Sequence, residues 1–359
     1  MSESNAAADA LTLRLAVDAR DLVSDRRGIG TYVRALVSRF AQRDDVALTL
    51  LVRHPLPMSM LPALRAAIGV SRARRIRCAN RVPRDVDVVW HPWNGTFFAG
   101  SIPAVATIHD LIPFALPAPD AQRRASEQEP IRRTAATARA IVCDSAFTAR
   151  DVARYLDVAP HRLHRVPLGV DPVFSPGEPD ALPPALRNRR YVLYVGAHDP
   201  HKNVGTLIAG HRRAFPGGEV ALAFTRSNPL APEAVVCDNV SVATLVALYR
   251  GATAVAIPSL YEGFGLPLIE AQACGAPVAA ARATALPETG GDAALYVDEP
   301  RDPGAWERAL REITTNAALR TALVRAGPVH AATFTWETCA QRTLAILSAT
   351  AGRSLFAAT

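Results

Sequence analysis

Short apolar runs alternate with amphipathic stretches along most of this chain. The runs have the length and the aliphatic content of buried strands, and they cover Leu13–Val17, Ala47–Val52, Val86–Trp90, Ala104–Ile108, Ala140–Cys143, Tyr191–Val195, Val220–Phe224, Ala254–Ile257, Pro277–Ala280 and Leu295–Val297. Between them, apolar residues recur with a helical period in stretches such as Thr31–Phe40, Ser145–Leu156, Thr244–Tyr249, Trp306–Ile313 and Trp336–Leu347. The alternation predicts the α/β class, with parallel sheets covered by helices on both faces.

One segment, Pro167–Arg190, is rich in proline and has no periodicity, so it indicates a connection between domains. A chain of 359 residues is also too long for one ordinary core. We therefore expect two doubly wound, Rossmann-like domains over residues 1–172 and 191–335, joined by a linker over 173–190. Residues 336–359 would form a closing helix and tail that packs back on the N-terminal domain. Ligands of such sheets bind at the carboxyl ends of the strands, so two such edges are expected to face across a cleft.

Composition and the distribution of apolar residues and cysteines indicate where in the cell the protein acts. No run of about 18 apolar residues is present, which argues against a membrane-spanning helix. The first ten residues lack the charged and apolar segments of a signal peptide. The five cysteines are far apart and form no Cys-x-x-Cys pair, so neither a disulfide framework nor a zinc site is favoured. These features predict a cytoplasmic protein.

The net charge of +7 is unevenly placed. The whole excess lies in residues 1–172, and it is densest in Ser71–Arg77, which holds Arg72, Arg74, Arg75 and Arg77. Such a surface would attract the anionic headgroups of a membrane's inner face or a phosphate-bearing acceptor. The alternative is a solvated basic face. No aromatic residues interleave with the arginines, so the pattern does not support nucleic acid as a partner.

Lys202 is the only lysine among the 40 basic residues. Lysine is a compact point charge on a thin stem, whereas arginine is a wide planar fork. A position that keeps lysine in so arginine-rich a chain therefore indicates a cation in a narrow space, for which a phosphate oxygen is the usual partner. The alternative is a chance position on the solvated surface.

The segment from Pro258 to Pro277 carries the most specific pattern in the chain. Two glycines, Gly263 and Gly265, follow a buried strand and precede a helix in which Pro267 suits the first turn. The free N–H groups of such a helix start form an anion site. Glu262 precedes the helix and Glu270 lies inside it. Because carboxylates repel phosphate, their expected targets are sugar hydroxyls, although a plain glycine turn with two surface glutamates is the alternative.

Glu262 and Glu270, set in Tyr-Glu-Gly-Phe-Gly-Leu-Pro and before Glu-Ala-Gln-Ala-Cys-Gly-Ala-Pro-Val, closely resemble the signature of retaining GT-B glycosyltransferases of family 4. The resemblance continues through residues 285–297 and 334–340. Upstream, Tyr194–Asn203 is similar to the family's phosphate-binding lysine loop. In the first half, residues 17–20, 28–32 and 107–110 also match, so the similarity covers nearly the whole chain. It is closest to the bacterial branch that transfers mannose and related sugars in surface polysaccharide synthesis.

The resemblance implies roles for individual residues. Lys202 would neutralise the donor diphosphate, Glu270 would hold ribose hydroxyls, and Glu262 would hold hydroxyls of the transferred sugar. The sugar and the phosphate would be held by backbone amides of Gly263, Phe264, Gly265 and Leu266. The glycine turn of Gly28, Ile29, Gly30 and Thr31 would close over the diphosphate, and His109 would sit at the reacting sugar. Taken alone, this histidine is as well explained by packing.

This chain also departs from the family. Ala197 stands where many relatives have an arginine, and His201 replaces another. Lys202 would then be the main cation on the diphosphate, with Arg226 as a candidate assistant. The segment Thr225–Ser241 is shorter than is usual near the nucleobase, which leaves the base open. GDP-mannose is the donor that the resemblance suggests first.

No metal or other cofactor is expected. Asp85-Val86-Asp87 looks like a metal motif, but it opens a strand in which successive side chains point to opposite faces. The resulting expectation is a metal-independent, retaining hexosyltransferase that uses a nucleotide-diphosphate sugar and a glycan or lipid-linked acceptor. The alternatives are a non-catalytic nucleotide-sugar-binding protein and an epimerase or phosphorylase with the same fold.

Overall fold

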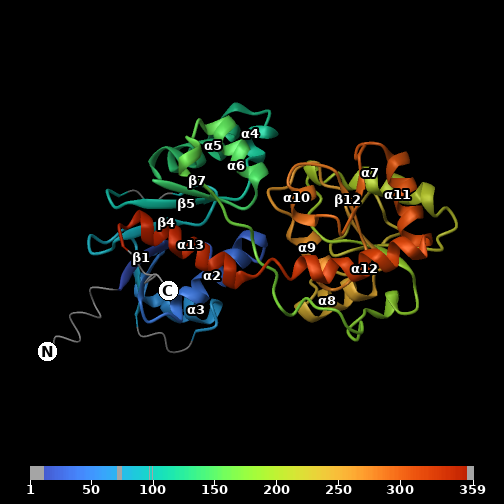
Figure 1. The fold of residues 1–359 in the computed structure, drawn as a ribbon, viewed down its shortest axis with the longest axis horizontal. Helices are drawn as coiled ribbons and strands as arrows, with labels where there is room; N and C mark the ends of the chain where they lie inside the picture. Colours follow the sequence, from blue (N-terminus) through green and yellow to red (C-terminus); the bar gives the residue numbers. More distant parts are fainter. Residues whose placement is uncertain (1–11, 71–74, 97, 99, 354–359) are drawn as a thin grey trace. The chain divides into compact units, whose positions relative to one another are not determined.

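The computed structural model describes residues 12–70, 75–96, 98 and 100–353. Contacts between Cα atoms divide the chain into two compact units (Figure 1). The first unit runs to Gly169 and takes up the chain again from Trp336, and the second unit is Val170–Thr335. The proline-rich segment Pro167–Arg190 holds a single 3₁₀ turn, Pro184–Leu186. From Val170 onward this segment groups with the second unit.

The first unit is built on a seven-stranded sheet in which every neighbouring pair is parallel. In sheet order the strands are β3 (Ile76–Ala79), β2 (Val46–Leu51), β1 (Leu13–Asp18), β4 (Val88–His91), β5 (Ala104–Ile108), β6 (Ala140–Cys143) and β7 (Leu163–Arg165). Its helices are α2 (Gly28–Ala41), α3 (Leu61–Ala67), α4 (Ile112–Ala115), α5 (Ala121–Thr137), α6 (Ala146–Leu156) and α13 (Trp336–Thr350). The central strands are buried along nearly their whole length, as their continuous apolar runs predict.

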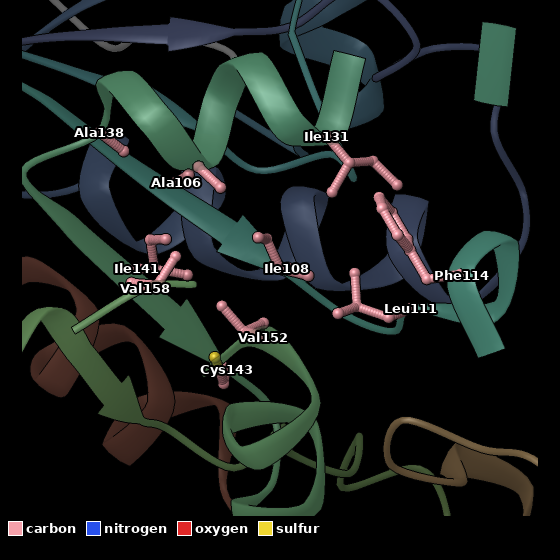
Figure 2. Close-up of a cluster of buried hydrophobic side chains, with 11 residues drawn as sticks. Ala106, Ile108, Leu111, Phe114, Ile131, Ala138, Ile141, Cys143, Val152 and Val158 are labelled. Atoms are coloured by element: carbon pink, nitrogen blue, oxygen red, sulfur yellow. The ribbon is translucent and has the colours of Figure 1, made fainter. Parts of the chain in front are cut away.

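One cluster of buried side chains shows how the helices cover this sheet (Figure 2). Ile108 of β5 and Ile141 of β6 are fully buried, and Ile131 of α5 and Val152 of α6 pack in the same cluster. The serine at the start of α6, Ser145, caps the helix by accepting a hydrogen bond from the Thr148 N–H. Helix α6 therefore packs against β5 and β6, and the predicted site residue His109 follows the end of β5.

The second unit is built on a six-stranded sheet that is also parallel throughout. Its order is β10 (Val235–Val236), β9 (Ala221–Phe224), β8 (Tyr191–Tyr194), β11 (Ala254–Ile257), β12 (Val278–Ala281) and β13 (Leu295–Val297). The helices are α7 (Val204–Ala214), α8 (Val242–Gly251), α9 (Leu266–Ala273), α10 (Leu286–Gly290), α11 (Pro303–Thr315) and α12 (Ala317–Ala331). The chain moves outward from β8 to β10 and then returns to β11, so the strand order reverses between β8 and β11.

The last helix, α13, belongs to the first unit although the second unit precedes it. It packs on α2 and along β4 to β6. The Trp336 ring lies 6.3 Å from the Tyr32 ring, and Arg39 forms an ion pair with Glu337 at 3.3 Å. No helix in the described part of the chain combines the length and the apolar content that a membrane crossing requires.

The α/β prediction is confirmed by these two parallel sheets with interleaved helices. Three edge strands, β3, β7 and β10, were not among the predicted runs because they are short and carry exposed or charged positions. Their absence from the prediction matters most at β3, because that strand contains part of the basic segment.

Candidate active site

Lys202 and Glu262 meet at the point where the strand order of the second unit reverses. Lys202 ends a 3₁₀ turn after β8, and Glu262 lies in the loop after β11. The carboxyl ends of two strands on either side of such a reversal form the usual ligand crevice of an open parallel sheet. The Lys202 Nζ lies 2.7 Å from the Glu262 Oε1. The two side chains remain 21% and 17% exposed, so the ion pair is open to a ligand.

The start of α9 completes this arrangement. Gly265 has a φ of 102°, and a side chain at this position would place a Cβ 2.8 Å from the Leu286 side chain, so only glycine fits. Within the described residues, the N–H groups of Phe264, Gly265 and Leu266 have no assigned hydrogen-bond acceptor. Free N–H groups at a helix start favour an anion, so this loop can bind one a short distance along the chain from Glu262.

Glu270 lies one turn further into α9 and is held in a different environment. The Tyr249 hydroxyl, from α8, donates a hydrogen bond of 3.0 Å to the Glu270 Oε2. Burial raises the pKa of Glu270 to about 7, and the nearby Asp171 adds to the rise, while the bond from Tyr249 opposes it. The Glu270 carboxyl is therefore poised between its charged and neutral forms near physiological pH.

The predicted glycine turn of the first unit starts α2. The helix begins at Gly28, and Ile29 and Thr31 are half-buried. A Cβ on Gly30 would lie 2.1 Å from the Asp25 carbonyl oxygen, so the preceding loop can approach the helix only at a glycine. The Thr31 hydroxyl donates to the Arg27 carbonyl at 3.2 Å. This backbone geometry is a tight loop-to-helix junction.

His109 follows β5 and is buried with both ring nitrogens engaged. Its Nε2 lies 2.8 Å from the Pro92 carbonyl oxygen, which can only accept, so this nitrogen carries a proton. Its Nδ1 lies 2.7 Å from the Asp144 Oδ2. Burial alone would lower the pKa of His109, but the Asp144 carboxylate and the two hydrogen bonds raise it above the ordinary value. A substrate would have to displace one of these partners to reach the ring.

Tyr32 connects the glycine turn to this histidine inside the first unit. It follows Thr31 directly, and its ring meets the His109 ring edge-on at 4.9 Å between centroids. Its hydroxyl lies 3.1 Å from the Thr107 Oγ1. The helix that starts at Gly28 thus contacts His109 through Tyr32.

The remaining predicted residues lie in other settings. Arg226 is exposed just beyond β9, and its backbone carbonyl lies 3.2 Å from the His198 Nε2. Arg75 donates to the Thr12 hydroxyl at 2.7 Å, and Arg77 donates to the Asp85 carboxylate at 2.6 Å.

In the described part of the basic segment, Arg75 and Arg77 therefore form hydrogen bonds at the edge of the first sheet. Arg72 and Arg74 lie outside the described residues.

Both aspartates of Asp85-Val86-Asp87, the sequence that looks like a metal motif, form ion pairs with arginines. Asp85 pairs with Arg77, and Asp87 pairs with Arg14 at 2.6 Å and with Arg353 at 3.1 Å. Among the residues that the structure describes, no group of three or more His, Cys, Asp or Glu side chains is arranged to hold a metal ion.

Three residues that the sequence did not single out take part in these sites. Tyr249 binds Glu270, Asp144 binds His109, and the Thr284 hydroxyl accepts a hydrogen bond of 2.9 Å from the Glu262 N–H. Each is distant in sequence from the residue it contacts. A tyrosine on a helix and a threonine in a loop give no local signal, whereas Asp144 at a strand end next to a capping serine could have been flagged.

Comparison with known proteins supplies the family. Residues 26–174 match the family described as "Glycosyltransferase Family 4", and residues 189–316 match "Glycosyl transferases group 1". The D-inositol 3-phosphate glycosyltransferase 1 of Catenulispora acidiphila is 30% identical over 306 residues, which cover 74% of this chain and 73% of that protein. The O-antigen chain mannosyltransferase B of Escherichia coli is 28% identical over 267 residues, 67% of this chain and 69% of that protein. Some relatives are longer, and the chain spans 51% of the D-inositol 3-phosphate glycosyltransferase of Segniliparus rotundus.

A solved structure agrees at the level of fold. The Anabaena protein Alr3699/HepE, in complex with UDP-glucose, has a TM-score of 0.69 at 14% identity, and the match covers 94% of this chain and all of that one. The predicted GT-B fold and the predicted membership of the family 4 glycosyltransferases are therefore confirmed. The chain belongs to the glycosyltransferases of group 1 and family 4.

Proposed function

We propose that this glycosyltransferase moves a mannose-like hexose from a nucleotide-diphosphate sugar to a glycan or lipid-linked acceptor, with retention of configuration at the sugar. The observation that carries the proposal is the contact of 2.7 Å between Lys202 and Glu262 beside the open start of α9. Lys202 would supply the cation for the diphosphate, and Glu262 beside it would supply the carboxylate for sugar hydroxyls.

The ion pair leaves capacity for both ligand groups. An ammonium has three N–H donors, and the bond to Glu262 uses one of them. Two donors of Lys202 remain for phosphate oxygens, and the second oxygen of Glu262 remains for a sugar hydroxyl. The free N–H groups at Phe264 to Leu266 would bind a further phosphate oxygen, and Glu270 would accept from the ribose hydroxyls.

In the proposed reaction, the bond between the anomeric carbon and the phosphate oxygen breaks, and the diphosphate leaves with the electron pair. The acceptor hydroxyl forms the new bond on the same face of the sugar, and its proton passes to an oxygen of the departing diphosphate. Lys202 and the α9 start would stabilise the charge that builds on that leaving group. No protein nucleophile and no metal ion is part of this scheme.

His109 has a proposed supporting role. Its pair with Asp144 and its bond to the Pro92 carbonyl fix the loop after β5, where a transferred sugar would be contacted in the first unit. Gly28 to Thr31 would lie beside the diphosphate at the start of α2, where Gly28, Ile29 and Gly30 would offer backbone N–H groups. The Thr31 N–H already donates to the Arg27 carbonyl at 3.0 Å.

The donor and the acceptor are proposals of their own. The E. coli relative is named as an O-antigen chain mannosyltransferase, which supports GDP-mannose and a bacterial surface polysaccharide. The structural relative that binds UDP-glucose supports the broader class of nucleotide sugars. We further propose that the protein acts in the cytoplasm at the inner face of the membrane, drawn there by the positive excess of residues 1–172.

The test combines binding with turnover. Purified protein is titrated with GDP-mannose, UDP-glucose and the free diphosphates, and release of nucleotide diphosphate is then followed with and without lipid-linked acceptors. We expect release that depends on an acceptor and yields an α-linked product from an α-linked donor. Binding without turnover on any acceptor would indicate a non-catalytic binding protein, and release or isomerisation without an acceptor would indicate hydrolysis or epimerisation. Inversion of configuration would contradict the retaining mechanism.

A further inference from the structure

Asn203, the residue after Lys202, connects three loops at the carboxyl edge of the second sheet. Its side-chain Nδ2 donates to the Pro300 carbonyl at 2.7 Å and to the Pro258 carbonyl at 3.2 Å. Its Oδ1 accepts from the Thr206 hydroxyl at 2.6 Å. Because both carbonyls can only accept, the amide orientation is determined by its surroundings. One side chain therefore joins the start of α7 to the loops after β11 and β13.

These contacts surround Lys202 on both sides along the chain. On one side, the His201 carbonyl accepts a hydrogen bond of 2.8 Å from the Leu260 N–H. On the other, Asn203 binds Pro258 in the same loop. That loop carries Glu262, so the lysine and its partner are held by two cross-links that flank the ion pair.

The backbone at Asn203 has a special conformation as well. Its φ is 55°, in the left-handed region, and it links the 3₁₀ turn that ends at Lys202 to the first turn of α7. Asparagine tolerates this region better than other residues with a side chain, apart from aspartate. The position therefore requires both a left-handed backbone and a double hydrogen-bond donor, and asparagine supplies both.

The anchor at Pro300 is rigid. The same carbonyl also accepts from the Trp306 indole N–H at 2.9 Å, and Trp306 is fully buried on α11. Helix α11 packs closely on α7, which starts at the residue after Asn203. The hydrogen bond from Asn203 to Pro300 therefore connects the loop that carries Lys202 to the core of the second unit.

We infer that Asn203 is a positioning residue for the proposed reaction, which sets the reach of the Lys202 ammonium toward Glu262 and a bound diphosphate. The inference rests on the proposed function, because it assumes that Lys202 binds the diphosphate. Asn203 itself contacts no substrate in this assignment. It acts by fixing where the neighbouring lysine starts and which loop faces it.

Two substitutions distinguish the role of the Asn203 side-chain hydrogen bonds from the role of its left-handed backbone conformation. Asn203→Asp keeps the shape and tolerates a positive φ, but it turns the donor into an acceptor that faces two carbonyls. Asn203→Gly keeps the left-handed backbone and loses the side chain. Asn188 offers a matched control, since it has a φ of 58°, is exposed, and lies in the same unit away from the Lys202 loop. Asn188→Asp makes the same chemical change at a position that lacks the hydrogen bonds to Pro258 and Pro300.

Binding of GDP and UDP to the full chain is measured by calorimetry for each variant, alone and combined with Lys202→Ala. For the nucleotide that binds better, we expect Asn203→Asp to weaken binding by about tenfold or more, since a displaced lysine loses a charge-assisted bond to phosphate. We expect Asn203→Gly to weaken it less and Asn188→Asp to leave it unchanged. In the Lys202→Ala background, substitution of Asn203 should have little further effect, because a residue that acts through another shows non-additive energies.

The outcomes separate the inference from the proposed function. If Lys202→Ala weakens binding while both Asn203 variants bind like the natural protein, the inference is wrong and the proposed function stands. If the effect of Asn203 persists at full size without the lysine, Asn203 does not act through Lys202, and the inference is also wrong. If Lys202→Ala leaves binding unchanged, the diphosphate role of Lys202 fails and the inference fails with it. Should Asn203→Asp unfold, Asn203→Gly decides in the same way.

Discussion

Replacing Glu270 by glutamine should stabilise the protein at high pH and not at low pH. The Glu270 carboxyl has a pKa of about 7, against an ordinary value of 4.5, chiefly because burial disfavours its charge. A carboxyl whose pKa is raised on folding binds its proton more tightly in the folded state. Its stabilising contribution is therefore complete below pH 4.5 and is lost progressively as the pH rises through 7. Glutamine is neutral at every pH and has no such dependence.

The size of the effect follows from the two pKa values. Because of this pKa difference, the Glu270 carboxyl contributes up to about 2.5 kcal/mol less to the free energy of unfolding at pH 8 than at pH 5. Because the Glu270 side chain is partly exposed, solvent screening makes this figure an upper bound. In a unit of this size, such a change in free energy corresponds to a difference in melting temperature of up to about 5–10 °C.

Scanning calorimetry at pH 5 and pH 8, in buffers of equal ionic strength, measures the difference directly. Calorimetry is preferred because two units can unfold in separate transitions, and only the transition of the second unit should respond. Glu270→Gln should gain stability relative to the natural protein on going from pH 5 to pH 8. Tyr249→Phe removes the hydrogen bond that opposes the pKa rise, so this variant should lose more stability over the same interval than the natural protein does.

The same substitution separates stability from function. Glutamine offers one acceptor oxygen where the carboxylate offers two, so Glu270→Gln should bind a nucleotide sugar more weakly even where it is more stable. A difference in stability between the variant and the natural protein that is equal at both pH values would refute the argument. It would mean that the carboxyl ionises as freely in the folded protein as in the unfolded chain.

Lys202→Ala should lower turnover by about a hundredfold or more, as expected when one fixed charge on a leaving group is lost, and steady-state kinetics would measure the loss. Lys202→Arg should also turn over poorly, and full activity of this variant would contradict the argument for a compact cation. Transfer should continue in EDTA, whereas a loss of activity that magnesium or manganese restores would show that the reaction needs a metal. Arg72→Glu combined with Arg74→Glu should reduce sedimentation with anionic liposomes, and equal sedimentation would leave the basic segment as solvated surface.

The sequence predicted the central strands well because a buried parallel strand needs an unbroken apolar run, and such runs stand out among helical periods. It predicted the edges poorly. Strand β3 has the pattern Ile76-Arg77-Cys78, in which a charged residue faces outward, so it does not resemble a buried run. The arginine run predicts a basic surface that is either solvated or faces anionic partners, and it does not indicate that Arg77 donates hydrogen bonds to Thr49 and Asp85.

The candidate site was also only partly predictable from the sequence. Glu262, Glu270 and Lys202 could be selected from their residue types and local spacing, and the reversal of strand order explains why two of them come together. Their environments could not be predicted. The pairing of Tyr249 with Glu270 and of Asp144 with His109 depends on how a helix or a neighbouring strand is placed, which no local pattern encodes. Together with burial, those contacts shift the pKa values of Glu270 and His109 from their ordinary values.

The ion pair also gives a reason why lysine is retained at position 202 in a chain that otherwise uses arginine. A guanidinium this close to Glu262 would tend to bind the carboxylate with two parallel N–H groups, which would satisfy both oxygens. That arrangement would leave no carboxylate oxygen for a sugar hydroxyl, and the rest of the fork would have a fixed direction. An ammonium bonds one oxygen and keeps two donors that can turn toward a phosphate. Lys202 and Glu262 can therefore neutralise each other without ligand and still bind opposite ends of a sugar diphosphate, which a pair of arginine and glutamate could not do in the same space.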